Sequence, residues 1–253
     1  MSFPKIRDIT LDILTRCGIT SPPVDLDKVV ARFHAGVVRS GHVAESALLH
    51  TPESWTIKVN REFRQERAAF RIAHELAHIY WSYPRNHQGD PSLGGKLERY
   101  CSKFASLLLC PHQWLVRDAP ASDHDLAALK RIYANVSHEA LAIRLSYLTA
   151  MVVTIFDNGQ LYRRFSSPGL GYPPAGQGPE TEIYEAVDIY SQFREKSGVI
   201  KWSGTERKVR VRGYPVIDGA FRRIILVTTP AAAQNLEDDL AFQDDMPYPF
   251  PEY

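Results

Sequence analysis

Cysteine is scarce in this sequence, and its three cysteines are Cys17, Cys101 and Cys110. Three cysteines are too few, and odd in number, for a disulfide framework, so a reducing compartment is favoured. The first residues, MSFPKIRDITLD, carry charge early and contain no apolar core of a signal peptide. No apolar run approaches the length that spans a membrane. We therefore expect a cytoplasmic protein with no membrane segment.

An excess of charge of either sign is also absent, because 30 Lys and Arg residues oppose 29 Asp and Glu residues. This balance excludes a global basic field that would attract nucleic acid, although a local basic patch can still exist. Hydrophobic residues make up 44% of the chain, which is ordinary for a folded soluble protein. A length of 253 residues allows one large domain or two to three small ones.

The hydrophobic periodicity predicts an α+β fold. Helices are expected at residues 4–17, 65–81, 97–109 and 181–196, with Gly198 as the stop of the last one and Asp25 as the N-cap of a further short helix. Residues 123–148 predict two short helices around a turn at 134–136, with Ser137 capping the second.

Strands are predicted from alternation and from turn signals. Residues 42–50 and 54–60 indicate two paired strands, Asn158-Gly159 indicates a hairpin within residues 152–165, and three more strands are expected at 200–204, 207–217 and 221–229. Residues 82–95 have the composition of a loop. Changes in composition divide the chain into residues 1–120, 121–150, 151–235 and an acidic, proline-rich tail at 236–253 that we expect to be disordered.

The segment FRIAHELAHIYW, residues 70–81, carries the strongest chemical signal. On a helix, His74 and His78 lie one turn apart on the same face and can bind one metal ion. Glu75 is then placed to act as the general base on a water at the open coordination position. Zinc is the expected ion, and manganese or iron is compatible with such ligands. The alternative is a pair of hydrogen-bonded core histidines, but both fall on the predicted buried stripe, where an unpaired imidazole is costly.

A catalytic zinc needs a third protein ligand. The extended pattern of the metzincin class requires Gly and His at the positions of Trp81 and Pro84, so that class is excluded. Glu98 lies 20 residues after His78 (98 − 78) and begins a helix whose apolar stripe continues through Cys101, Ala105 and Leu108. We expect Glu98 to be the ligand, with Asp90 in reserve; the alternative is a solvated glutamate favoured by the helix dipole.

A group that stabilises the oxyanion of the transition state is also required. Tyr80, Tyr100, His87 and His112 are within plausible reach by sequence, and Tyr100 and His112 are our two candidates. The sequence does not choose between them.

Taken together, these segments resemble the ImmA/IrrE metallopeptidases. The similarity covers the N-terminal helix and turn, IRDITLDILTRCGITSPPVDLDKVV, the strand SWTIKVN before the motif helix, the segment LERYCSKFASLLLCP and the segment VSHEALAIRLSYL. It is specific over residues 1–150 and weaker beyond them. The family usually has Ala-Asn where this chain has Cys101-Ser102, and Cys110 replaces a common Met or Leu, so the surroundings of the site differ from the family pattern.

The resemblance implies a gluzincin-like zinc peptidase domain at 1–120, a helix-turn-helix-like segment at 121–150 and a GAF-like sensor domain at 151–235. It also places the third ligand on Glu98. Members of the family cleave helix-turn-helix transcriptional repressors, which relieves repression of stress-response or mobile-element genes. A repressor is thus the implied protein partner.

Two other functions stay open from the sequence. The chain is alternatively a DNA-binding regulator, in which the second helix of residues 123–148 would expose His138, Glu139 and Arg144 to the DNA and the metal site would not be catalytic. Alternatively, a small-molecule effector binds the GAF-like domain and gates the protease, with basic residues such as Arg163, Arg164, Arg222 and Arg223 near its pocket.

Overall fold

A computed structural model describes residues 3–82, 91–171, 173–202 and 204–231. They divide into two compact units, which we call the first unit, up to Leu141, and the second unit, from Ala142. The predicted tail lies outside the described residues, as does most of the predicted loop, residues 83–90. No helix in the described ranges has the length and apolar character needed to cross a membrane.

The first unit contains a three-stranded sheet with the order β1-β3-β2. Its strands are β1 (Ala35–Ser40), β2 (Ser46–His50) and β3 (Trp55–Asn60). β2 pairs antiparallel with β3, which confirms the two predicted paired strands, and β1 runs parallel to β3. β1 was not predicted because it is an edge strand with mostly exposed residues, so it lacks the in-out alternation that marks a half-buried strand.

The described part of the first unit also contains six helices that precede or follow these strands in the chain. They are α1 (Phe3–Arg16), α2 (Leu26–Arg32), α3 (Gln65–Ser82), α4 (Pro91–Leu109), α5 (His112–Ala121) and α6 (Leu126–Ile132). Asp25 caps α2 as predicted, since its carboxylate accepts a 3.3 Å hydrogen bond from Lys28 N. α4 begins six residues before the predicted start, at a proline, whose missing N–H is not needed in a first helical turn.

α5 was missed because Pro111 was taken only as the end of the preceding helix. In the structure Pro111 occupies the N-cap of α5, so one proline separates two consecutive helices. A proline costs little there, because the first N–H groups of a helix have no intrahelical partner.

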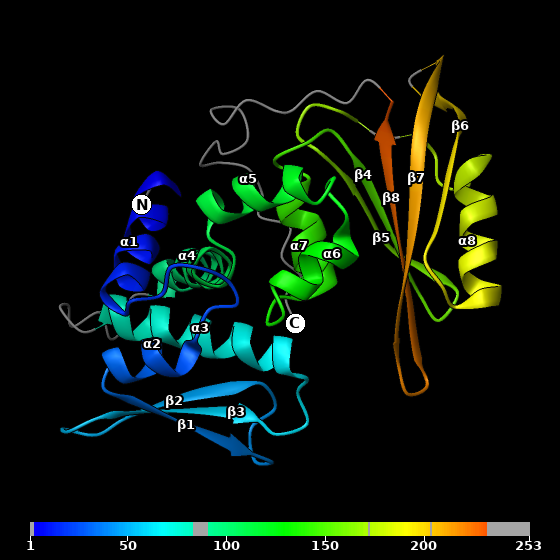
Figure 1. Ribbon diagram of the computed structural model, residues 1–253. Coiled ribbons are helices and arrows are strands. Elements are labelled where there is room, and N and C mark those ends of the chain that lie inside the picture. Colours follow the sequence, from blue (N-terminus) through cyan, green and yellow to red (C-terminus); the bar gives the residue numbers. More distant parts are fainter. Residues whose placement is uncertain (1–2, 83–90, 172, 203, 232–253) are drawn as a thin grey trace. The chain divides into compact units, whose positions relative to one another are not determined.

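α3 forms the centre of the first unit. It lies across the three-stranded sheet and against α4 (Figure 1). Ile57 and Val59 of β3 are fully buried, as are Leu76 of α3 and Phe104 and Leu108 of α4. The motif helix is therefore held between two apolar layers, which fixes the directions of its side chains.

α7 (His138–Leu145) follows α6, and Ser137 Oγ caps it by accepting a 3.1 Å hydrogen bond from Ala140 N, as predicted. The alternative in which this helix exposes a recognition face to DNA does not fit its burial. Glu139 and Arg144 are each only 1% exposed and His138 is half-buried. Residues 141–155 are buried without interruption, so α7 lacks the polar outer face of a surface helix.

The second unit is a five-stranded antiparallel sheet with the order β5-β4-β8-β7-β6. Its elements are β4 (Val152–Asp157), β5 (Gln160–Ser166), α8 (Pro179–Tyr190), β6 (Arg194–Trp202), β7 (Thr205–Asp218) and β8 (Phe221–Pro230). The β4–β5 hairpin turns at Asn158 and Gly159, both with positive φ, which confirms the predicted turn.

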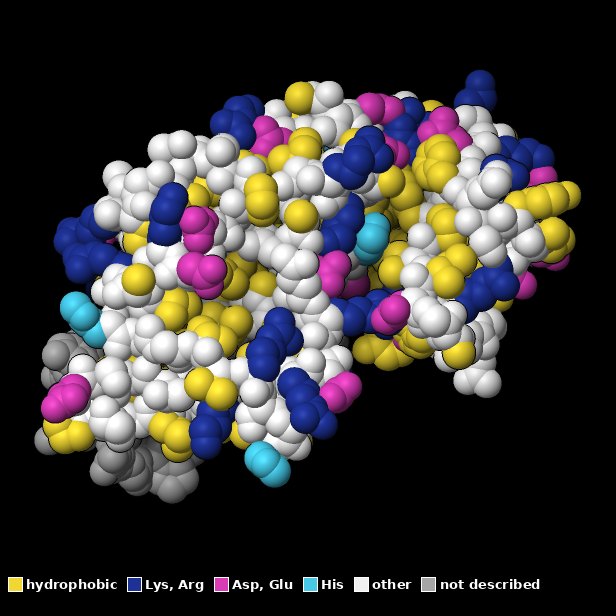
Figure 2. Space-filling model, turned by 60° about the horizontal axis from the view of Figure 1, so that its bottom comes forward, with side chains coloured by type: hydrophobic (Ala, Val, Ile, Leu, Met, Phe, Trp, Pro, Cys, Tyr) yellow, Lys and Arg dark blue, Asp and Glu magenta, His cyan; other side chains and the backbone are white. Residues whose placement is uncertain are grey.

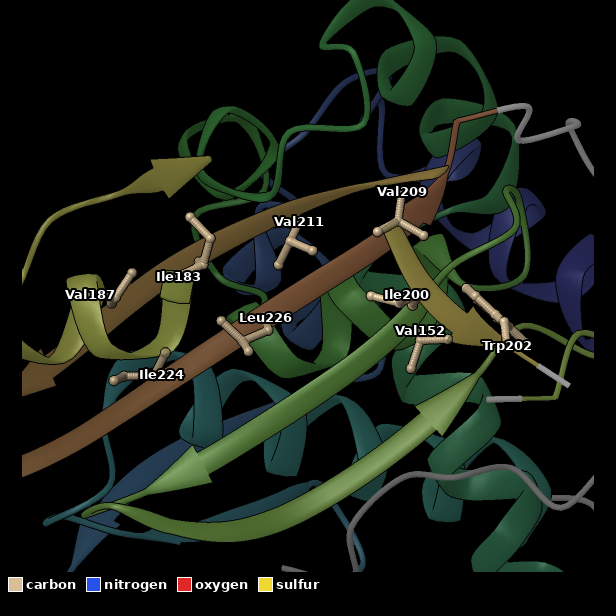
Figure 3. Packing of buried hydrophobic residues seen from close by; sticks show 9 residues of the cluster. All are labelled: Val152, Ile183, Val187, Ile200, Trp202, Val209, Val211, Ile224 and Leu226. Atoms are coloured by element: carbon tan, nitrogen blue, oxygen red, sulfur yellow. The ribbon is translucent and has the colours of Figure 1, made fainter. Parts of the chain in front are cut away.

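The core of the second unit lies between α8 and one face of the sheet. Figure 3 shows Ile183 and Val187 of α8 among side chains from the strands, including Val211, Ile224 and Leu226. These residues are buried, and the helix approaches the sheet at a glycine, Gly213. The small residue makes the close approach of helix and strand possible.

The predicted end of α8 is wrong. The helix was expected to continue to residue 196, but it ends at Tyr190, where Ser191 adopts a left-handed conformation. Residues 194–202 instead form β6, because their backbone pairs with β7 along nine residues. Gly198 is not a helix stop; a Cβ at Gly198 would lie 3.0 Å from Pro179 Cγ, so the glycine accommodates the start of α8.

Candidate metal centre

The motif helix presents its two histidines as a pair. His74 and His78 lie one turn apart on α3, with ring centroids 5.0 Å apart and Nε2 atoms 3.2 Å apart. The two imidazoles thus point their Nε2 atoms at a common point. This is the arrangement that the i, i+4 spacing predicts.

α4 brings Glu98 to the same point. Glu98 Oε2 lies 3.0 Å from His74 Nε2, and Glu98 Oε1 lies 3.2 Å from His78 Nε2. The three residues that sequence reasoning selected as ligands are therefore in mutual contact. The packing of α4 on α3 through apolar side chains such as Phe104 and Leu108 holds the carboxylate there.

The donor atoms have the spacing of a zinc site. Two ligand atoms of one tetrahedral zinc, each about 2.0 to 2.1 Å from the ion, are about 3.3 Å apart. The observed separations of 3.0 to 3.2 Å among the two imidazoles and the carboxylate are close to this value. The residues present therefore fit a zinc ion.

A cysteine lies beside the same pair. His74, His78 and Cys101 form a possible metal site, since a ring nitrogen of each histidine and Cys101 Sγ all lie within 4.8 Å of one another. Sequence reasoning did not consider Cys101 as a ligand, although its position three residues after Glu98 puts both on one face of α4. Their exposure differs, because Cys101 is fully buried, whereas the Glu98 side chain is 57% exposed.

Glu75 is buried next to the histidines and is held by a serine. Ser46 Oγ, at the start of β2, donates a 2.6 Å hydrogen bond to Glu75 Oε1. The neighbouring Glu45 pairs with Arg67 and Arg71 of α3 at 2.7 and 2.5 Å, which ties the beginning of β2 to the motif helix. Ser46 was missed because nothing in its local sequence distinguishes it from other strand serines.

The electrostatics of the site follow from these contacts. Hydrogen bonds from His74 and His78 hold the pKa of Glu98 well below its usual range. Burial alone would lower the pKa of His78, but the Glu98 hydrogen bond and the charges of Glu98 and Glu75 raise it overall. Burial, with the charges of Glu98 and Glu75, raises the pKa of the Cys101 thiol. The site thus attracts positive charge, which a metal cation supplies.

A further hydroxyl contacts the other side of His74. Ser102 Oγ lies 3.4 Å from His74 Nδ1, which orients the ring so that Nε2 faces Glu98. Such outer contacts on a ligating histidine fix its tautomer and its direction. Ser102 stands where the family that the sequence resembles usually has Asn.

The predicted oxyanion candidates occupy different surroundings. The Tyr100 ring packs 6.4 Å from Trp81, and His112 is buried at the start of α5. Tyr80 lines a cavity of about 490 Å³ together with Phe33, His50 and Trp55. His87 and Asp90 lie outside the described residues.

Comparisons with known proteins agree with this geometry. Residues 36–146 match the model of the IrrE N-terminal-like domain, a peptidase family. A solved structure titled as a Mycobacterium tuberculosis transcriptional regulator has the same fold, with a TM-score of 0.64 at 17% identity, over 91% of this chain and 81% of that one. A search of curated proteins found no match. The matched residues include His74, Glu75, His78 and Glu98, and the match supports a likeness to the ImmA/IrrE peptidases.

Proposed function

We propose that this chain is a zinc-dependent endopeptidase. The observation that carries the proposal is the convergence of His74, His78 and Glu98 within 3.2 Å of one another, with Glu75 buried beside them. A bound zinc would polarise the scissile carbonyl and make a water acidic enough to lose its proton near neutral pH. His74, His78 and Glu98 would hold it.

The chain's own residues have separate roles in this proposal. Glu75 accepts the proton of the attacking water through a carboxylate oxygen and then delivers it to the leaving amine. Ser46, which donates to Glu75 Oε1, keeps the carboxylate in one orientation and leaves its other oxygen for the water. The exposed side of Glu98 is the side from which a peptide reaches the site.

β2 is suited to bind the substrate backbone. It is an edge strand of the three-stranded sheet and begins at Ser46, whose hydroxyl contacts the proposed base. An extended peptide that adds to this edge would place its carbonyl groups along the approach to the site. The enzyme would therefore select an unfolded or extended segment of its target.

The proposed target is a transcriptional repressor of the helix-turn-helix class. The support for this step is the resemblance to ImmA/IrrE metallopeptidases together with the IrrE N-terminal-like match over residues 36–146. The proposal includes a cytoplasmic location, where the repressor acts, and the free thiols of Cys17, Cys101 and Cys110 suit a reducing compartment.

Co-expression with the repressor that is encoded beside this chain tests the proposal. We expect one repressor fragment of defined length in the presence of metal and none when a chelator has removed it. An intact repressor under both conditions, with metal shown to be bound, would contradict the proposal.

We also propose that the second unit is a GAF-like sensor that binds a small effector. The support is topological: an antiparallel sheet of order β5-β4-β8-β7-β6 with α8 covering one face. Two of the arginines expected near its pocket are in ion pairs, Arg164 with Glu180 and Arg223 with Asp157. Thermal unfolding in the presence of nucleotides and other small metabolites checks this, and a transition that no compound shifts would count against it.

The DNA-binding alternative has less support. The residues that would contact DNA, Glu139 and Arg144, are buried. Figure 2 shows Lys and Arg side chains interspersed with Asp and Glu over the visible face, where phosphate binding would need a continuous basic patch. Salt-dependent operator binding by a Glu75→Gln variant would restore this alternative.

A further inference from the structure

Cys101 occupies an unusual place for a buried thiol. It follows Glu98 by three residues on α4, so the two side chains leave the helix on the same face. Its side chain is fully buried, and its Sγ lies within 4.8 Å of a ring nitrogen of both His74 and His78. The thiol is therefore close enough to both imidazoles to be considered as a donor to the same ion.

The distances are short enough for ligation after a small movement. Zinc binds sulfur at about 2.3 Å and imidazole nitrogen at about 2.0 to 2.1 Å, so the two donor atoms of one tetrahedral ion are about 3.6 Å apart. Since its separation from each imidazole nitrogen is at most 4.8 Å, the Cys101 sulfur needs to approach the histidines by about 1.2 Å at most (4.8 − 3.6).

Another cysteine of the chain provides an internal contrast. Cys110 follows directly after α4 and is 1% exposed, so its burial matches that of Cys101. It lies nine residues further along, which is about 13 Å at the helical rise. Among the described residues, the group of mutually close donor atoms contains Cys101 and not Cys110.

We propose that Cys101 is a fourth protein ligand of the metal, bound as a thiolate in the resting protein. The inference rests on the proposed metal site of His74, His78 and Glu98. On ligation the thiol gives its proton to solvent and the sulfur forms the bond to the metal. Four protein ligands make a closed site of the structural type, whereas a catalytic site keeps one position for water.

Two consequences follow from this ligand set. With a metal bound, the Cys101 sulfur would occupy the position that a water needs, and would take up a proton from solvent when it gave that position up, so the thiol would hold the resting peptidase inactive. A thiolate also favours zinc or cobalt over manganese, because manganese prefers oxygen ligands. The histidines and the carboxylate alone would accept several metals, and the thiolate restricts them to softer ions such as zinc.

Cobalt spectroscopy on the full-length chain tests the proposal. Metal-free wild type, Cys101→Ser and Cys110→Ser are each titrated with Co²⁺. We expect wild type and Cys110→Ser to show the near-ultraviolet sulfur-to-cobalt charge-transfer band with one bound cobalt, and Cys101→Ser to bind cobalt with that band lost. A band of wild-type intensity in Cys101→Ser would overturn the proposal, as would its absence from wild type.

A measurement without any variant covers the case in which Cys101→Ser does not fold. X-ray absorption at the zinc edge of the wild-type protein should show one sulfur at about 2.3 Å among nitrogen and oxygen neighbours. A zinc shell without sulfur would refute ligation by Cys101.

Failure of this proposal can be told apart from failure of the peptidase proposal. Repressor cleavage by wild type without a sulfur-to-cobalt band removes only the role of Cys101. A band in wild type that is lost in Cys101→Ser, with no cleavage by either protein, keeps the ligand and removes the peptidase function.

Discussion

Ser46 Oγ donates a 2.6 Å hydrogen bond to Glu75 Oε1, and this contact joins the first residue of the edge strand β2 to the proposed general base on α3. It positions the carboxylate from outside the motif helix. The ion pairs of Glu45 with Arg67 and Arg71 fix the same strand end on the same helix. The orientation of the base and the place where a substrate strand would pair are therefore set by one junction.

Replacement of Glu75 by Gln should abolish cleavage and leave metal binding intact. The amide keeps the size and the Ser46 contact of the side chain but cannot accept the proton of a water. We expect at least a loss of about 100-fold, the size that general-base catalysis contributes. Cleavage assays and metal analysis of the same preparation check this, and wild-type activity in Glu75→Gln would contradict the proposed mechanism.

Ser46→Ala should cause a smaller loss than Glu75→Gln. It removes one hydrogen bond to a charged group, worth about 1.5 kcal/mol, which corresponds to about a tenfold effect on the rate. The variant should bind metal like wild type, because the hydrogen bond of Ser46 goes to Glu75 and not to a proposed metal ligand. A loss as large as that of Glu75→Gln would show that Ser46 acts directly in the reaction.

Glu98→Ala should weaken zinc binding by more than about 100-fold, because even the loss of an outer contact to a ligand costs about 10- to 100-fold. The exposed Glu206 of β7 offers a matched control, and Glu206→Ala should bind zinc like wild type. Competition with a chelator of known affinity measures both. Equal affinity of Glu98→Ala and wild type would show that another residue supplies the third ligand.

The sequence predicted the parts of the fold that depend on local signals. The caps at Asp25 and Ser137 and the turn at Asn158-Gly159 each use one short motif, and all three are confirmed. The end of α8 and the strand β6 were misjudged because pairing with β7 over nine residues outweighs the helical pattern of residues 191–196. Long-range backbone pairing leaves no mark on local periodicity.

In the candidate site too, the sequence predicted the residues that follow from local spacing and missed those that tertiary packing brings in. The histidine pair follows from a spacing of four on one helix, whereas the place of Glu98 was inferred from an apolar stripe that had to pack on the correct neighbour. Ser46 and Cys101 reach the site through tertiary packing: one comes from a strand 29 residues before Glu75, and the other enters from the buried side of α4. Neither contact is visible in the sequence next to the motif.

As the pH is lowered, zinc affinity should begin to fall at a higher pH than it would if His78 had the usual pKa of a histidine. Glu98 and Glu75 raise the pKa of His78 above its usual value, and a proton on the ring must leave before the metal binds. Below that pKa, affinity should fall by at least about tenfold per pH unit, because His78 must lose its proton and His74 must also be neutral to bind. The measurement is best made in Cys101→Ser, so that no thiol proton contributes; an affinity that is constant from about pH 8 to about pH 5 would contradict it.

The first unit should lose stability between about pH 6.5 and pH 4 through His138. Burial and the charge of Lys130 lower the pKa of His138 to about 4 in the folded protein. Over this range the unfolded chain binds a proton that the folded chain does not, so the free energy of unfolding falls as the pH falls. The loss should approach about 2 to 3 kcal/mol by pH 4.

Denaturant unfolding at about pH 7 and about pH 4.5 measures this loss. His138→Gln should remove most of the His138 contribution, because glutamine does not titrate, and His42→Gln, at an exposed position, should behave like wild type. An identical pH dependence in wild type and His138→Gln would show that other groups cause the loss in acid.

Gly213→Ala should destabilise the second unit. A Cβ at Gly213 would lie 2.6 Å from Ile183 Cγ2 and 2.7 Å from Val187 Cγ2, closer than carbon atoms in contact can approach. Since α8 and β7 must separate or their side chains must rotate, we expect a cost of about 1 to 3 kcal/mol. Trp202 is the tryptophan of this unit and is buried in its core, so its fluorescence reports the unfolding.

A second substitution tests whether the cost arises from this clash. Val187→Ala alone leaves a cavity and should also destabilise the unit. In the double variant the methyl group that Gly213→Ala adds occupies part of the space that Val187 vacated, so the two losses should sum to more than the double variant shows. Additive losses would mean that the cost of Gly213→Ala does not arise from the contact with Val187.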